Sequence, residues 1–72
     1  MTNTLEKRLR IISIRQSAAD LVGECNDFQI IFCAAATGIV ARTETTLEKM
    51  SNEDLYNLYE WIVSEVHVDT WA

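Results

Sequence analysis

The clearest alternation of hydrophobic and polar positions lies between Met50 and Val66, and it predicts an amphipathic helix. At about 100° per residue, the apolar side chains of this stretch fall within one arc and the polar ones lie opposite. Ser51 is suited to cap the helix, and Glu53 and Asp54 fall in its first turn, where the helix dipole favours negative charge. The apolar arc consists of Leu55, Leu58, Tyr59, Ile62 and Val66.

Trp61 does not follow the pattern of this helix. It projects away from the apolar arc, on the same side as Asn57, Ser64 and Glu65. We therefore expect the indole to lie outside the core that the arc forms. A large aromatic side chain with polar neighbours is typical of a protein-binding surface. The competing interpretation is that Trp61 packs against the N-terminal part of the chain or against a second copy.

Residues 4–22 carry hydrophobic residues at helical spacing on two faces. Thr4 can cap this helix, and Gly23 is suited to end it because glycine readily adopts a left-handed conformation. A strand over Leu9–Arg15 is the alternative, but two adjacent isoleucines break the alternation of a strand. A helix that is apolar on two faces needs two neighbours. One face carries Leu5, Leu9, Ile12 and Ala19, and the other carries Ile11, Ile14, Ala18 and Leu21.

Residues 28–42 allow two interpretations. A β-hairpin turning at Thr37-Gly38 is one; a helix over residues 28–41, capped by Asp27, is the other. Three consecutive alanines are poor strand formers and favour the helix, although Gly38 costs about 1 kcal/mol relative to alanine there. One side of this helix carries large groups, Phe28, Ile31, Phe32, Ala35 and Ile39, and the other carries Ile30, Ala34, Thr37 and Ala41.

The remaining segments are polar connections and the C-terminal end. Residues 43–49 link to the last helix, with a short helical turn at 46–49 and with Leu47 placed to lie beneath that helix. Residues 67–72 are expected to fray. No internal repeat or low-complexity run divides the chain, so residues 1–72 are predicted to form a single domain.

Together these patterns predict an all-α protein with three main helices, near residues 4–22, 28–41 and 52–67. The alternative is an α+β fold with a central hairpin at 28–43. A domain of this size buries only about 60% of its unfolded surface, so its core is small. The hydrophobic fraction of 49% is high for such a domain. We therefore expect a homodimer, formed through the two-faced middle helix, to complete the core.

The sequence contains no run of about 18 apolar residues and no signal-peptide pattern, so we expect a cytoplasmic protein without a membrane span. In that compartment Cys25 and Cys33 are expected to be buried, reduced thiols. With His67 they are too few and too widely spaced for a structural zinc site. We expect no metal and no cofactor.

Catalytic motifs are absent from the sequence. Ser64 and His67 lie three residues apart on one predicted helix, without a third group to orient them. The two glycines, Gly23 and Gly38, are isolated and form no phosphate-binding loop. We therefore expect a protein that is not an enzyme.

Charge is distributed unevenly along the chain, whose net charge is −5. Residues 1–16 carry four basic residues and one acidic residue, whereas residues 43–72 carry seven acidic residues and one lysine. The basic residues Lys7, Arg8, Arg10 and Arg15 could contact phosphates, so a small dimeric regulator that binds nucleic acid is one hypothesis. Against it, the chain as a whole is acidic and no aromatic residues alternate with these cations.

Binding to a larger protein with a basic surface is the favoured hypothesis. An acidic surface steers a basic partner and raises the association rate. A small acidic protein of this kind can inhibit as a decoy or serve as an adaptor, as small phage-encoded inhibitors of host defence are expected to do, which makes a viral origin a hypothesis too. The predicted partner-binding residues are Asp54, Asn57, Trp61, Glu65 and Trp71.

Overall fold

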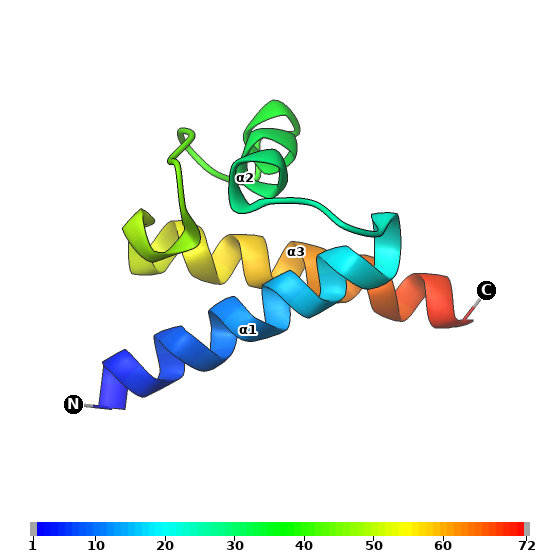
Figure 1. The fold of residues 1–72 in the computed structure, drawn as a ribbon, viewed down its shortest axis with the longest axis horizontal. Coiled ribbons are helices and arrows are strands. Elements are labelled where there is room, and N and C mark those ends of the chain that lie inside the picture. Colours follow the sequence, from blue (N-terminus) through cyan, green and yellow to red (C-terminus); the bar gives the residue numbers. More distant parts are fainter. Residues whose placement is uncertain (1, 72) are drawn as a thin grey trace.

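The computed structural model describes the backbone of residues 2–71 and the side chains of residues 4–66. It contains three α-helices, α1 (Thr2–Val22), α2 (Asp27–Ala36) and α3 (Asn52–Trp71), and a short 3-10 helix, η1 (Leu47–Lys49). Helices α1 and α3 pack against each other and run in the same general direction, while α2 lies on one side of the pair (Figure 1). Residues 2–71 contain no strand. The predicted all-α fold with three main helices is confirmed.

Helix α1 ends where the sequence indicates. The amide of Gly23 donates to the carbonyl oxygen of Ala19 at 2.9 Å, and Gly23 has a φ of +82°, which an L side chain rarely adopts. The predicted start was wrong, because the helix begins at Thr2 and includes Thr4 instead of using it as a cap. Threonine costs only a few tenths of a kcal/mol inside a helix, so nothing at this position stops the helix from extending.

Only one of the two apolar faces of α1 is covered. Ile11, Ile14 and Ala18 are buried, whereas Leu5, Leu9 and Ile12 on the other face are 61%, 57% and 49% exposed. The expectation of two neighbours is therefore not met within this chain, because the core covers only the side of α1 that carries Ile11, Ile14 and Ala18.

Helix α2 differs from its prediction at both ends. Its N-cap is Asn26 and not Asp27: the Asn26 side chain accepts from the Gln29 amide at 2.9 Å, and the Gln29 side chain accepts from the Asn26 amide at 2.8 Å. This reciprocal pair is a capping box. The helix ends at Ala36 and not at residue 41, because Gly38 has a φ of +83° and the Ile39 amide turns back to the Ala34 carbonyl.

The two sides of α2 are buried unequally. Phe28 and Phe32, which belong to the side with large groups, are 48% and 58% exposed, with ring centroids 6.1 Å apart. Ile30 and Ala34, from the side with smaller groups, face the core together with Ile31.

The start of α3 matches its sequence pattern. The Asp54 amide donates to the Ser51 hydroxyl at 3.2 Å, which confirms the cap, and the flanking residues Met50 and Leu55 are both buried. Leu47, at the start of η1, is fully buried, as expected for a residue beneath the last helix. Helix α3 extends through Trp71, so the prediction that residues 67–72 fray was wrong for the backbone of residues 67–71.

None of the helices, over the residues searched, is long and apolar enough to cross a bilayer.

One hydrophobic core joins all these elements. The core consists of Ile11, Ile14 and Ala18 from α1, Ile30, Ile31 and Ala34 from α2, Val40, Leu47 and Met50 from the connection, and Leu55, Leu58 and Ile62 from α3.

Candidate functional site

Arg15 joins α1 to the two segments that follow it. Its Nε donates to Asp27 Oδ1 at 3.0 Å and its Nη2 donates to Asp27 Oδ2 at 2.7 Å, which makes a bidentate pair. The same Nη2 contacts the carboxylate of Glu48 in η1 at 3.1–3.2 Å. Asp27 Oδ2 also accepts from the Leu47 amide at 3.1 Å. One arginine and one aspartate thus connect α1, the start of α2 and η1.

This network changes how Asp27 titrates. Hydrogen bonding to Arg15 lowers the pKa of Asp27; partial burial opposes the shift, and the Leu47 amide reinforces it. The hydrogen bond to Asp27 raises the pKa of Arg15 further above its already high value. The Asp27 side chain is 16% exposed and that of Arg15 is 44% exposed, so water screens the pair in part. Asp27 therefore does not cap α2, as the sequence predicted; it pairs with Arg15 instead.

Two more of the α1 cations have intramolecular partners. Lys7 Nζ donates to the Met50 carbonyl oxygen at 3.2 Å, just before α3. The Arg10 guanidinium lies 5.3 Å from the ring centroid of Tyr56 and 5.9 Å from that of Tyr59, within the range of cation–π interactions. Of the four predicted phosphate contacts, Arg8 is the exposed one that has no partner among the described side chains.

The acidic residues of α3 differ from these cations, because those between residues 52 and 66 are in no ion pair among the described side chains. Between residues 52 and 66 this helix carries four carboxylates and no lysine or arginine. Glu53, Glu60 and Glu65 are exposed and Asp54 is half-buried, and none of the four is in an ion pair within the part of the chain whose side chains are described. Helix α3 therefore presents uncompensated negative charge.

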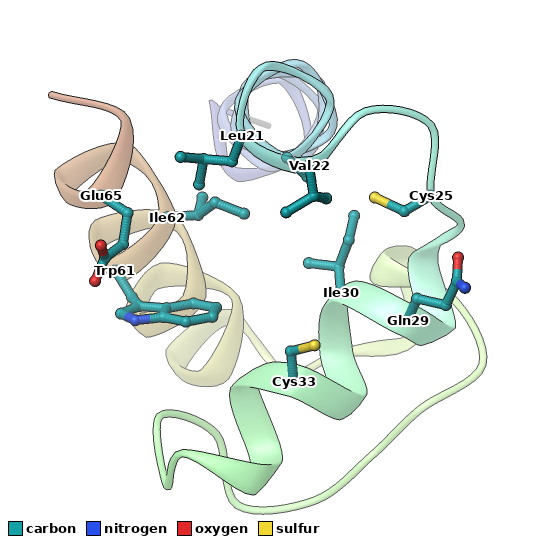
Figure 2. Close-up of a pocket in the computed structure, with 10 residues that line it drawn as sticks. Leu21, Val22, Cys25, Gln29, Ile30, Cys33, Trp61, Ile62 and Glu65 are labelled. Atoms are coloured by element: carbon teal, nitrogen blue, oxygen red, sulfur yellow. The ribbon is translucent and has the colours of Figure 1, made fainter. Parts of the chain in front are cut away.

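Trp61 lies at the edge of the core and not outside it, which corrects the sequence prediction. The indole is partly buried against the core, and it lines an apolar groove of about 330 Å³ between the end of α1, the start of α2, and α3. Figure 2 shows Leu21, Val22, Ile30 and Ile62 pointing into this groove. The direction of a side chain on one helix does not show where a neighbouring helix will lie, and here α2 lies on the Trp61 side.

A second, more polar hollow of about 430 Å³ adjoins the groove. It is lined by the turn after α2, at Gly38 and Ile39, and by the outer face of α3. Trp61 and Glu65 line both hollows, so they form the boundary between an apolar space and an acidic one. We call the α3 part of this region the Trp61 surface; it consists of Asn57, Glu60, Trp61, Ser64 and Glu65.

The structure brings together three of the five predicted partner-binding residues. Asn57, Trp61 and Glu65 line the same hollow. Asp54 lies two helical turns before Trp61 and does not line it. Trp71 lies outside the residues whose side chains are described, as does His67, so these two predictions are not resolved.

The two cysteines were placed wrongly by sequence reasoning. Cys25 is partly buried and Cys33 is exposed, and both are free thiols that line the apolar groove. The groove could not be found from the sequence, because its walls come from three segments whose relative placement no local pattern encodes. The clearest local signal was Trp61 itself. Among the described residues, no cluster of three or more histidine, cysteine or carboxylate side chains is placed to bind a metal.

Comparisons with models of known protein families, with curated proteins and with solved structures found no match for this chain. Its function is therefore inferred from the geometry and charge described above.

Proposed function

We propose that this chain is a non-enzymatic interaction protein that acts in the cytoplasm. It binds a larger protein partner through the Trp61 surface and thereby inhibits or adapts that partner. The partner presents a basic surface. Asp54 adds negative charge on the same helix, and Trp71 remains a further predicted contact.

The observation that carries this proposal is the unequal use of charge within the fold. Three of the four cations near the N-terminus, Lys7, Arg10 and Arg15, have intramolecular partners. The carboxylates at Glu60 and Glu65 have none among the described side chains, and they flank a partly buried tryptophan. An aromatic side chain beside a groove and inside a charged rim has the composition of a binding hot spot.

Affinity capture with matched charge variants tests the proposal. The wild type is expected to recover a stoichiometric protein from a lysate of its source cells, and Glu65→Lys is expected to lose it. Asp20→Lys is the matched control, because it makes the same charge change at an exposed position of α1 that does not line either hollow. Titration of the purified partner then gives the dissociation constants. Equal affinity of the wild type and Glu65→Lys would show that binding does not involve the Trp61 surface.

The alternative function, a dimeric regulator that contacts nucleic acid through Lys7, Arg8, Arg10 and Arg15, has less support. To bind phosphate, Arg15 would have to exchange two carboxylate partners for it, and Arg10 would have to leave two aromatic rings. A mobility-shift assay separates the two functions. Salt-sensitive binding that is lost in the Arg8→Ala, Arg10→Ala double variant would favour nucleic acid and contradict the protein-binding proposal.

We also propose that the protein self-associates, as expected from its small core and high apolar content. The exposed side chains Leu5, Leu9 and Ile12, which lie on one face of α1, support this proposal, because exposed apolar surface of this kind commonly marks an interface. Light scattering after size-exclusion chromatography tests it. A monomer that persists at tens of micromolar protein would contradict it.

A further inference from the structure

We infer that the outer face of α1 of one copy binds the apolar groove and the Trp61 surface of another copy, so that self-association occupies the partner-binding surface. The inference rests on the function proposed above, since it assigns a regulation to that same surface. A second copy is the favoured occupant because the chain itself carries a face with matching apolar character and charge.

The apolar half of the match comes from Leu5, Leu9 and Ile12. Their spacing of four and three residues places them in one row on α1, and each is about half exposed or more. A row of this spacing is the pattern with which one helix packs against others. The groove offers aliphatic walls from three elements, and its volume of about 330 Å³ is large enough to accept side chains from such a row.

The charged half of the match comes from Arg8. It lies one helical turn from both Leu5 and Ile12, on the edge of the same row, and is exposed without a partner among the described side chains. The groove likewise has an acidic hollow on one side, with Glu60 and Glu65 in its lining. A helix that places Leu5 or Ile12 in the groove would bring Arg8 toward these carboxylates and the face of Trp61, which also attracts a guanidinium.

The alternative contact between copies is α2, the helix through which the sequence predicts dimerisation, with its exposed aromatic pair Phe28 and Phe32. That face offers apolar surface but no charge that distinguishes one orientation or partner from another. The α1 face and the groove complement each other in both respects, so they are the favoured contact.

A charge-swap experiment tests the inference. Light scattering and analytical ultracentrifugation over a concentration series give the association constant of the wild type and of each variant. Arg8→Glu and Glu65→Arg are each expected to weaken association about tenfold or more, because opposite charges become like charges. The double variant, Arg8→Glu with Glu65→Arg, is expected to restore association because the attraction is re-formed with its signs exchanged.

Two controls separate this contact from general effects. Arg42→Glu makes the same charge change as Arg8→Glu at a position that is 80% exposed and outside both hollows, and it is expected to leave association unchanged. Phe32→Lys tests the α2 face and is also expected to leave it unchanged. Loss of association in Phe32→Lys together with wild-type association of Arg8→Glu would overturn the inference in favour of α2.

The remaining outcomes are also decisive. A wild type that is monomeric at all concentrations, or a charge-swapped double variant that does not recover association, overturns the inference. Neither result affects partner capture, which depends on Glu65 in the monomer as well. If both the inference and the proposed function hold, adding the purified partner is expected to dissociate the self-associated form, because both compete for the same groove.

Discussion

The cations of α1 and the carboxylates of α3 show how differently one fold can use its charges. Arg15 donates to Asp27 and Glu48, and Asp27 also accepts from the Leu47 amide, so the charge of Arg15 helps to link α1, α2 and η1. The exposed acids of α3, among them Glu60 and Glu65, contact no cation within the described side chains. In the sequence both groups look like surface charge. Only the contacts show that the first group is largely paired within the fold and that the second has no cation beside it among the described side chains.

The largest effect is expected for Asp27, which is the common partner in the structural group. Asp27→Ala removes the carboxylate that binds Arg15 and accepts from the Leu47 amide, and it is expected to lower the free energy of unfolding by about 2 kcal/mol, a figure that allows for screening at the half-exposed Arg15. Chemical denaturation measures it. Asp27→Asn, which keeps an acceptor oxygen, is the control and should lower the free energy of unfolding by less. No loss in either variant would contradict a structural role for this network.

The same network predicts that the free energy of unfolding depends on pH in the acidic range. Because the pKa of Asp27 is lowered in the folded state, its contribution is present above the ordinary carboxyl pKa and is lost as the pH falls through the lowered value. The difference in unfolding free energy between the wild type and Asp27→Asn is therefore expected to shrink from about pH 5 downwards. A difference that stays constant down to acid unfolding would show that the charge of Asp27 does not matter.

A smaller loss is expected for Arg10, whose partners are aromatic. Arg10→Gln removes the cation from the rings of Tyr56 and Tyr59 and should cost about 0.5 kcal/mol, the usual range for an exposed cation–π contact. Thermal unfolding at a protein concentration where the chain is monomeric measures the change, with Arg8→Gln as the matched control, because Arg8 has no partner among the described side chains of its own copy. Equal changes in the two variants would place Arg10 among the available charges instead of the structural ones.

The smallest effect on stability is expected for the acids of α3. Glu60→Gln and Glu65→Gln should change the free energy of unfolding by less than about 0.5 kcal/mol, and in the stabilising direction, because they reduce the repulsion within a chain of net charge −5. Binding of the partner should weaken in the same variants. If either substitution destabilises the fold by more than about 1 kcal/mol, that carboxylate has a structural role and the comparison fails.

Local patterns in the sequence determined much of the fold. Ser51 capped α3 and Gly23 ended α1, because each of these features depends on neighbours within a few residues, and the helical spacing of Leu55 and Leu58 identified the face of α3 that joins the core. Where a pattern allowed two interpretations, the sequence alone could not decide between them. The end of α2 at Ala36 follows from the positive φ of Gly38, yet glycine inside a helix costs only about 1 kcal/mol, too little to decide from sequence.

The tertiary structure decided which faces were covered and which charges were partnered. In the sequence the two apolar faces of α1 look equivalent, and only helix packing buried Ile14 and left Leu9 exposed. It showed Trp61 leaving the apolar arc of α3, but not that α1 and α2 would build a groove beside it. The physical reason is the separation along the sequence of the residues that interact. A helix follows from contacts over three or four residues, whereas a groove or an ion pair such as Arg15 with Asp27 depends on segments brought together by folding.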